Sequence, residues 1–583
     1  MRMLRIGLAQ INPTVGDLDG NATLIVEAIS KARDLGVELL AFPEMVVPGY
    51  PPEDLLLRPA FIQRTIETTR ELLPHTAGLT VIVGTLERDQ DLYNAAAVMH
   101  DGHWVGTARK RYLPNYGVFD ENRYFMAERR THVFSRGGVV FGVNVCEDIW
   151  LSGPSEEQVV RGGAEVIFNL SASPYHARKA EERRRMLATR ATDHLAIVGY
   201  VNLVGGQDEI VFDGASFLID ERGNVLAEGA TFAADLVVAD VDLDEVFNAR
   251  LHDTRLRKER TLEEEEPLPR IEVPVARHSD SGGGGAVVST RPALAPRPPR
   301  VERESHAEIY EALQLGVHDY VAKNGFETVV LGLSGGIDSA LMACIAVDAL
   351  GPEHVVGVSM PSEFTSSESM RDAEALAKAL GIRFEVIPIR EVITAYDKAL
   401  ASTFAGRTPD TTEENLQARV RGNYLMALSN KFGWLVLTTG NKSETSVGYS
   451  TLYGDTAGGY AALKDVYKTQ VYELARWRIR STAMIPEHTL ARAPSAELRR
   501  DQTDQDSLPP YEVLDGILRL YVEEDRSIAE IVRAGHEEAV VRRIARLVDL
   551  SEYKRRQSPP GIKITPRAFG KDRRLPITNR WRG

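Results

Sequence analysis

The stretch Leu331–Leu341, LGLSGGIDSAL, decides the fold of the second half of this 583-residue chain. An apolar run rich in β-branched residues (327–333) leads into it, and a helix-forming run (339–350) follows. Glycines in such a turn let backbone N–H groups close around a phosphate at the positive end of the helix. The stretch therefore predicts a strand–loop–helix unit that binds a phosphate group.

Two carboxylates accompany this loop in the sequence. Asp338 lies inside the loop, where it would repel a phosphate unless a cation lay between them, and magnesium is the natural cation. The loop is not a Walker A motif, because GxxxxGK[ST] is absent. Glu444 follows the end of a later predicted strand, where doubly wound sheets bind ligands. Each carboxylate alone is an ordinary surface charge, whereas together they predict a Mg2+ site.

Apolar strands alternate with helix-length segments on both sides of a Gly/Pro-rich break, SDSGGGGAVVSTRPALAPRPPR (279–300). After the break the alternation predicts a doubly wound, Rossmann-like parallel sheet. Before it, strands such as 38–44, 139–148 and 196–205 alternate with helices and predict an α/β sandwich. We therefore divide the chain into a first domain (1–275), a linker (276–300) and a second domain (301–583).

The chain has two cysteines, and their surroundings differ. Cys344 lies in an apolar helix and fits a packing role. Cys146 ends an apolar strand, VVFGVNVCED, at a charged edge of the kind where sites form. A thiol becomes a nucleophile only as a thiolate, which needs a base and a cation. Glu44 ends another predicted strand and Lys110 lies in a basic segment, so both are candidates, although each alone is more often a surface charge.

The order Glu44, Lys110, Cys146 resembles the catalytic triad of the nitrilase superfamily. The segments AFPE (41–44), RKRYLPNYGVFDE (109–121) and VNVCEDIW (143–150) are similar to its amidases, and the likeness spans about 275 residues. It implies an α-β-β-α sandwich in which Glu44 is the base, Cys146 the nucleophile and Lys110 an oxyanion donor. By the same resemblance Glu121 orients Lys110 or the water, and Arg178 stands where many relatives have glycine. The glutamine-binding residues that it implies are Tyr116, Ser173 and Lys179.

The second half resembles the ATP-pyrophosphatases, which cleave ATP between the α and β phosphates, and within them the NAD synthetases. The loop SGGIDS and the segments at 438–455, 464–475, 493–515 and 552–565 carry the likeness. It implies that Asn415, Glu444 and Lys554 hold deamido-NAD, and that Asp338 and Glu444 bind Mg2+. The residues implied to bind ATP are Gly332, Leu333, Ser334, Gly335, Gly336, Ile337, Asp338, Ser339, Thr439, Lys468 and Ser495.

Together the two halves predict a ligase that takes ammonia from glutamine and amidates an adenylated carboxylate, with glutamine, ATP and deamido-NAD as small-molecule substrates. The net charge of −14 argues against nucleic acid as a partner. The N-terminal sequence lacks signal-peptide features and no run could span a bilayer, so we expect a cytoplasmic enzyme. Ammonia would be protonated in bulk water, so we expect an internal channel. Domains that share a channel must keep a fixed geometry, which favours a homo-oligomer.

Three alternatives stay open at this point. The acceptor could be another carboxylate, which an acceptor screen would reveal. The chain could thiolate tRNA, since that machinery also uses SGGxDS, although the acidity and the lack of paired sulfur-relay cysteines argue against it. The third alternative is a silent nucleotide sensor with a vestigial amidase. The basic C-terminal segment (556–583) is expected to be a surface tail, or by resemblance a cover over the nucleotide.

Overall fold

The computed structural model describes residues 2–262, 265–274, 291–297, 303–480, 482 and 484–581. The chain folds into two compact units. The first unit comprises Met1–Gln207 and Phe212–Glu302, and the second comprises Arg303–Gly583 together with Asp208–Val211. Most of the predicted linker lies outside the described residues. Among the residues that are described, no helix is both long enough and apolar enough to cross a bilayer.

The first unit is built on two stacked sheets. The six-stranded sheet has the order β14-β1-β2-β3-β4-β5, in which β1 runs parallel to β2 and antiparallel to β14. Its strands are β1 (Met3–Gln10), β2 (Leu39–Ala41), β3 (Thr80–Arg88), β4 (Leu92–His100), β5 (His103–Arg109) and β14 (Asp235–Asp242). The second sheet has the order β13-β12-β9-β8-β7-β6-β15. Its strands are β6 (Val133–Arg136), β7 (Val139–Val145), β8 (Val166–Ser171), β9 (Ile197–Asn202), β12 (Phe217–Ile219), β13 (Val225–Glu228) and β15 (Arg270–Glu272).

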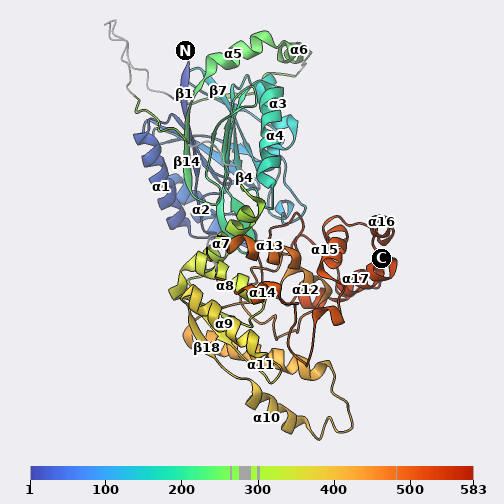
Figure 1. Cartoon of the computed structure of the whole chain (residues 1–583). Coiled ribbons are helices and arrows are strands. Elements are labelled where there is room, and N and C mark those ends of the chain that lie inside the picture. The colour runs from blue at the N-terminus through green and yellow to red at the C-terminus, as the bar shows by residue number, and fades with distance from the viewer. Residues whose placement is uncertain are drawn as a thin grey trace, which may run out of the picture. The chain divides into compact units, whose positions relative to one another are not determined.

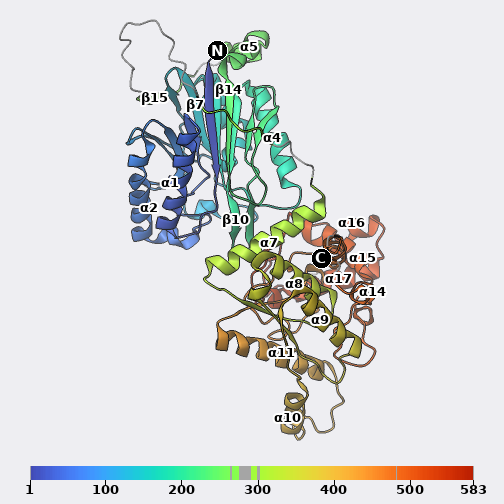
Figure 2. The same ribbon diagram turned by 60° about the vertical axis from the view of Figure 1, so that its left-hand side comes forward.

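Helices cover the outer face of each sheet, as Figures 1 and 2 show. One core cluster joins side chains of both sheets, for example Leu8 and Ile82 with Phe141 and Phe168. A second cluster lies between the second sheet and its helices. The helices of this unit are α1 (Leu18–Asp34) and α2 (Pro59–Glu71) outside one sheet, α3 (Ser152–Val160) and α4 (Lys179–His194) outside the other, and α5 (Leu243–His252) and α6 (Arg255–Leu262). The layers are α-β-β-α, which confirms the predicted sandwich.

The predicted strand over 196–205 is wrong in detail. The chain leaves the sheet after β9, and Leu203 N donates to Ser171 O at 3.1 Å. It then forms β10 (Val204–Gln207), which pairs with β11 (Ile210–Asp213) in a separate two-stranded sheet. Gly205 has φ +120, a conformation that glycine adopts readily and other residues rarely do. The break itself falls at Leu203, between β9 and β10, and Gly205 lies inside β10. The hydrophobicity of the stretch is continuous across the break.

The second unit contains a four-stranded parallel sheet of order β18-β17-β16-β19. The strands are β16 (Val329–Gly332), β17 (Val355–Ser359), β18 (Arg383–Val386) and β19 (Leu435–Leu437). Strand order reverses at β16, because β17 and β18 lie on one side of it and β19 on the other. Such a switch point is where doubly wound sheets bind ligands at the carboxyl ends of the strands. The predicted sheet is confirmed.

The helices of this unit pack around the sheet and form a separate helical cluster. Those near the sheet are α7 (Ser305–Lys323), α8 (Ile337–Leu350), α9 (Ser367–Leu380), α11 (Thr411–Phe432) and α13 (Lys468–Arg478). Helix α10 (Arg390–Leu400) lies on a long excursion between β18 and α11 (Figure 1). The others are α12 (Lys442–Val447), α14 (Glu487–Ala491), α15 (Tyr511–Leu518), α16 (Ile528–Arg533), α17 (Glu538–Leu550) and α18 (Glu552–Arg555). Side chains of α12, α15 and α17 share one apolar core.

Most of the C-terminal segment is not the expected surface tail. Ile562 and Ile564 are fully buried, and Phe569 belongs to the core of the helical cluster. Beyond Arg573 the described chain is mostly exposed, as at Ile577 and Trp581. The basic composition misled the prediction, because its buried cations are paired with carboxylates rather than solvated.

Candidate active sites

The structure brings the three predicted triad residues together at the ends of three strands of the first unit. Glu44 follows β2, Lys110 follows β5 and Cys146 follows β7. Lys110 Nζ donates to Glu44 Oε1 at 2.7 Å and to Glu121 Oε1 at 2.9 Å. Glu44 and Lys110 are completely enclosed, and Cys146 is 3 % exposed. The sequence prediction that Glu121 orients Lys110 thus has a direct contact in the structure.

Glu44 is held by neutral donors as well as by the lysine. Asn94 Nδ2 donates to Glu44 Oε1 at 2.6 Å, and the backbone N–H of Ala172 donates to Glu44 Oε2 at 2.9 Å. Hydrogen bonds of this kind stabilise the ionised carboxylate. Tyr50 donates in the same way to Glu121 Oε1 at 2.9 Å. The carboxylate of Glu44 is therefore held by three hydrogen bonds from within the protein.

The charges of this site set its resting protonation. Burial raises the pKa of the Cys146 thiol well above its usual value, Glu44 raises it further, and Lys110 opposes the shift. Burial alone would lower the pKa of Lys110, but the carboxylates of Glu121 and Glu44 raise it well above the usual value. Burial raises the pKa of Glu121 to about 7 against the effect of Lys110. Burial thus favours the neutral thiol of Cys146, whereas the neighbouring carboxylates favour the charged form of Lys110.

The backbone bends sharply at the nucleophile. Cys146 has φ +44, in the left-handed region that non-glycine residues seldom occupy. It opens a short 3-10 turn, Cys146–Ile149, directly after β7. Cys146 therefore lies at the junction between the strand and the turn rather than inside the strand. The predicted strand over 139–148 is therefore three residues too long.

Asp148 is a site residue to which the sequence analysis gave no role. Its Oδ2 accepts from Val145 N at 3.0 Å, and its Oδ1 accepts from Arg111 N at 3.1 Å and Tyr112 N at 2.8 Å. One buried carboxylate thus joins the turn that carries Cys146 to the segment that carries Lys110. The only sequence signal was its place in the motif VNVCEDIW.

The three predicted glutamine-binding residues lie in different settings. Tyr116 is exposed, and its hydroxyl donates to Glu147, the residue after Cys146, at 3.0 Å. Ser173 is buried next to Ala172, and its N–H donates to Asn202 Oδ1 at 2.9 Å. Lys179, the first residue of α4, donates to Glu182 at 3.0 Å and lies 4.4 Å from the ring centre of Trp150. Contacts thus tie the surroundings of Tyr116 and Ser173 to the triad, whereas those of Lys179 are with α4 and Trp150.

Arg178 immediately precedes α4 and adopts a left-handed conformation, φ +68. A glycine would adopt this conformation without steric cost. The backbone at this position therefore suits glycine, the residue that the resemblance led us to expect there. The arginine side chain is largely exposed and pairs with Glu181 at 3.6 Å.

In the second unit the predicted phosphate loop connects β16 to α8. Gly335 has φ +79, and a Cβ there would clash with the backbone of Ser369. Ser339 Oγ donates to Gly336 O at 2.9 Å, which holds the turn closed. Helix α8 begins at Ile337, two residues earlier than predicted, and in this described segment its N-cap, Gly336, provides no side-chain cap. The first-turn N–H groups are therefore free of a capping side chain, at the positive end of the helix.

The two predicted metal ligands, Asp338 and Glu444, both contact the side chain of Lys468. Lys468 Nζ pairs with Asp338 and donates to Glu444 Oε1 at 3.1 Å. Asn441, the N-cap of α12, donates from Nδ2 to Asp338 Oδ1 at 2.9 Å. Burial raises the pKa of Glu444 to about 7 although Lys468 opposes the shift. Burial would lower the pKa of Lys468, but Asp338 and Glu444 raise it above the usual value.

This donor set fits Mg2+ bound jointly by protein and substrate. Two carboxylates, Asp338 and Glu444, converge on one positive charge. Within the described ranges, no group of three or more His, Cys, Asp or Glu side chains is gathered as a metal site. Mg2+ characteristically takes one or two carboxylates together with substrate phosphates and water. The pair therefore suits a cation that arrives with a nucleotide.

The remaining predicted residues surround this centre. Leu331 pairs with Leu437, so Thr439 leaves the sheet at the same edge as the phosphate loop. Ser495 accepts from Glu497 N at 3.2 Å, and Glu497 accepts from Ser369, the residue against Gly335. Thr451 donates to Asn415 Oδ1 at 2.7 Å. Lys554 donates to Gly448 O and Ser450 O at 2.7 and 2.6 Å, so Asn415 and Lys554 both hold the segment that follows α12.

Family models match both halves of the chain: carbon-nitrogen hydrolase over residues 5–250 and NAD synthase over residues 309–558. The chain is 50% identical to the glutamine-dependent NAD(+) synthetase of Thermotoga maritima, with all of both chains covered. It is 48% identical to that of Aquifex aeolicus, with 99% of this chain and 100% of the relative covered. The chain belongs to the glutamine-dependent NAD synthetases. The predicted family, fold class and enzyme class are thereby confirmed.

A solved glutamine-dependent NAD synthetase, from Acinetobacter baumannii in complex with ADP, matches with a TM-score of 0.73 at 40% identity. The match covers 99% of each chain. In the chain described here, Glu44, Lys110 and Cys146 lie inside the carbon-nitrogen hydrolase match, and the phosphate loop lies inside the NAD synthase match. Each site therefore has a family model of its own.

Proposed function

We propose that this chain hydrolyses glutamine at Cys146 and uses the ammonia, with ATP, to amidate deamido-NAD to NAD. The products are NAD, AMP, pyrophosphate and glutamate. The observation that carries the proposal is the arrangement of Lys110 between Glu44 and Glu121 beside Cys146. A carboxylate base, a fixed cation and a bent nucleophile turn are what thiol amidase chemistry needs.

In the first half-reaction Glu44 takes the proton from the Cys146 thiol, and the sulfur attacks the side-chain carbonyl carbon of glutamine. The oxyanion receives hydrogen bonds from Lys110 and from the N–H that follows Cys146. Glu44 returns the proton to the leaving nitrogen, and ammonia departs from the thioester. Glu44 then activates a water molecule, which releases glutamate and restores the thiol.

Asp148 serves this chemistry as a positioning residue. It fixes the distance between the segment of Lys110 and the turn of Cys146 through three backbone N–H groups. Reacting groups must be held within fractions of an ångström for efficient attack. Tyr116, Ser173 and Lys179 are proposed to hold glutamine, as the resemblance implied.

In the second half-reaction the carboxylate of deamido-NAD attacks the α-phosphate of ATP and pyrophosphate leaves. Ammonia then attacks the acyl-adenylate and AMP leaves. The loop from Gly332 to Ser339, with Thr439, Lys468 and Ser495, is proposed to hold ATP. Asn415, Glu444 and Lys554 are proposed to hold deamido-NAD. Asp338 and Glu444 would hold Mg2+, which neutralises phosphate charge and so favours attack and departure of pyrophosphate.

The cellular context stays part of the proposal. Because ammonia is protonated in bulk water, we propose that it travels through an internal passage between the two reactions. We also propose that the enzyme is a homo-oligomer and is cytoplasmic. Sedimentation of the purified chain would measure its subunit number. An acceptor screen with other carboxylates, and a binding assay with tRNA, address the two competing activities. Stoichiometric AMP release would contradict a silent sensor.

The deciding experiment compares wild type with Cys146→Ala, with glutamine or ammonium chloride as the nitrogen source. The expected result is that Cys146→Ala loses glutamine-driven NAD formation and keeps ammonia-driven formation. Cys344→Ala is the matched control, since that thiol is buried in α8 among apolar neighbours. If both nitrogen sources still work in Cys146→Ala, the cysteine is structural and the proposal for the first unit is wrong.

A further inference from the structure

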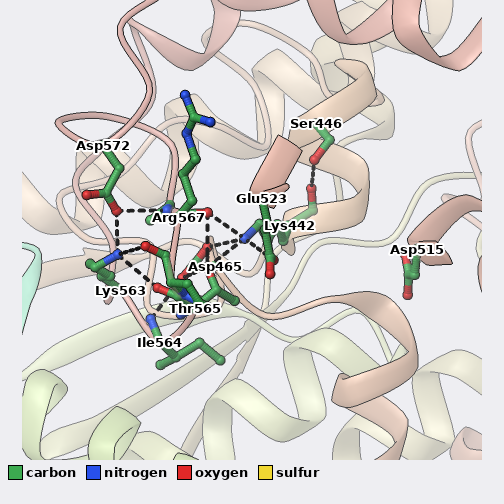
Figure 3. A network of polar contacts seen from close by, with 12 residues as sticks. Lys442, Ser446, Asp465, Asp515, Glu523, Lys563, Ile564, Thr565, Arg567 and Asp572 are labelled. Carbon is green, nitrogen blue, oxygen red and sulfur yellow. Dashed lines mark hydrogen bonds and ion pairs between the residues drawn. The ribbon is translucent and has the colours of Figure 1, made fainter. Parts of the chain in front are cut away.

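The C-terminal segment contacts helix α12 through one buried lysine, Lys442 (Figure 3). Lys442, the first residue of α12, is fully enclosed. Its Nζ donates to Thr565 Oγ1 at 2.7 Å, Glu523 Oε1 at 2.8 Å and Arg567 O at 3.0 Å, and pairs with Asp465 Oδ1 at 2.8 Å. Three other parts of the second unit, around Asp465, Glu523 and Thr565, therefore meet at the ammonium group of Lys442.

Asp465 fastens the C-terminal segment to this lysine. Its Oδ2 accepts from the backbone N–H groups of Ile564 and Thr565, each at 2.8 Å. Thr565 Oγ1 donates to the same oxygen at 2.8 Å while it accepts from Lys442. Thr565 thus links both ends of the Lys442–Asp465 ion pair to the tail.

A second ion pair closes the tail on itself. Lys563 pairs with Asp572 and also donates to Thr565 O at 2.8 Å. Asp572 in turn accepts from Ala568 N at 2.9 Å. The tail is therefore a folded turn with its own internal bonds, rather than a loose extension lying on the surface.

The two anchored segments also carry predicted site residues. Lys442 lies between Asn441, which contacts Asp338, and Glu444, which contacts Lys468. Asp465 lies three residues before Lys468. Helix α12 has only six residues, and helices this short have little stability of their own. Its position must therefore come from anchors such as Lys442.

We infer that the segment Ile562–Asp572 is a positioning element of the adenylation site, acting through Thr565 on Lys442 and Asp465. The segment sets where Asn441, Glu444 and Lys468 stand relative to the phosphate loop. This inference rests on the proposed function of the second unit. Groups behind metal and phosphate ligands commonly tune a site without touching the substrate.

Thr565→Val tests the inference, because valine keeps the shape of threonine and removes the hydroxyl that bridges the ion pair. The expected result is a loss of about 10- to 100-fold in ammonia-driven NAD formation, with a raised KM for ATP. Glutamine hydrolysis should be unchanged, and Thr565→Ser should restore synthesis because it restores the hydroxyl. The matched control is Thr578→Val, the same change at an exposed threonine that follows the segment Ile562–Asp572.

The readout separates positioning from simple stability. If Thr565→Val lowers the thermal midpoint but leaves KM for ATP and kcat unchanged below it, the segment is only structural and the inference is wrong. A failure of Thr565→Ser to restore synthesis would also overturn it. Failure of the proposed function has a different signature, because the wild type would then form no NAD from ammonium chloride, and the inference would fall with it.

Discussion

The two candidate centres each contain a buried lysine between two carboxylates, and they differ in how far those carboxylates are exposed to solvent. Each ammonium contacts two carboxylates: Lys110 contacts Glu44 and Glu121, and Lys468 contacts Asp338 and Glu444. In the first unit the carboxylate side chains are 0% and 5% exposed. In the second they are 16% and 19% exposed. The carboxylates of the centre in the first unit are thus shielded from solvent, whereas those of the centre in the second unit reach it.

The supporting contacts explain the difference. Glu44 has two neutral donors, Asn94 and the N–H of Ala172, besides its lysine. Asp338 has one described neutral donor, Asn441, besides Lys468. A carboxylate that acts as a base must keep one position, while one that binds Mg2+ with a nucleotide must be able to exchange partners. The comparison teaches that one motif, a lysine between two acids, serves either purpose according to its surroundings.

The largest expected effect comes from removing each lysine. Lys110→Met should abolish glutamine-driven synthesis and lower the free energy of unfolding of the first unit by about 3–5 kcal/mol, because Glu44 and Glu121 lose their buried counter-charge. Lys468→Met should abolish synthesis from either nitrogen source but destabilise the second unit less, since its carboxylates reach solvent. Calorimetry of both variants, with assays on both nitrogen sources, measures this. Equal destabilisation would break the comparison.

Asp148→Asn should have the next largest effect. An amide replaces one acceptor oxygen by an N–H donor, so a backbone N–H near Cys146 or Lys110 loses its partner. We expect glutamine hydrolysis and the alkylation rate of Cys146 to fall by about 100-fold, with ammonia-driven synthesis unchanged. Asp193→Asn, at an exposed aspartate of α4, is the control. Unchanged hydrolysis in Asp148→Asn would show that the three backbone bonds are dispensable.

A pH experiment sharpens the comparison further. Burial raises the pKa of both Glu121 and Glu444 from 4.5 to about 7, so the folded state holds a proton that the unfolded state releases. The resulting stability is present below pH about 4.5 and is lost as pH rises to about 7. Glu121→Gln and Glu444→Gln should each flatten this dependence, by a few kcal/mol at most.

Denaturant unfolding across that pH range, with and without Mg2+ and ATP, supplies the measurement. A cation beside Glu444 keeps the carboxylate ionised, so Mg2+ and ATP should flatten the pH dependence of the second unit alone. The first unit, whose carboxylates are shielded from solvent, serves as the internal control. An equal response of both units to Mg2+ and ATP would contradict the division into a shielded and a solvent-exposed centre.

The smallest effect is expected at Arg178. Arg178→Gly relieves a left-handed backbone and should raise the stability of the first unit by no more than about 1 kcal/mol, with glutamine hydrolysis unchanged. Arg178→Ala keeps the strained backbone and loses the pair with Glu181, so it should give no gain. Thermal midpoints of the two variants decide between them. A gain in Arg178→Ala would mean that the side chain, rather than the backbone, is unfavourable.

Much of both sites could be predicted because each key residue ends an apolar strand or lies in a glycine-rich turn. Glu44, Cys146 and Asp338 were candidates because of these positions, and the family resemblance supplied the roles predicted for Glu44 and Cys146. The prediction erred where one strand ends and another begins inside an apolar run, as between β9 and β10 at Leu203. The ends of a run of hydrophobic residues do not show where the backbone leaves the sheet.

Long-range polar contacts could not be predicted. Asp148 acts on backbone groups 36 and 37 residues away, and Lys442 meets Thr565 across 123 residues. Any of the chain's many charged side chains could have filled these places, because a charge carries no local sign of its partner. The burial of the C-terminal segment could not be predicted for the same reason, because the sequence around Lys563 does not show that the lysine pairs with Asp572.

The left-handed turn at Cys146 has a consequence for the evolution and engineering of this enzyme. A non-glycine residue in that conformation costs about 1–2 kcal/mol, and glycine would relieve most of it. Glycine at position 146 would therefore favour stability, but a Cys146→Gly variant would lack the proposed nucleophile. A library selected only for survival of heat would accumulate inactive variants there, so such a selection has to be paired with growth that depends on glutamine as the nitrogen donor.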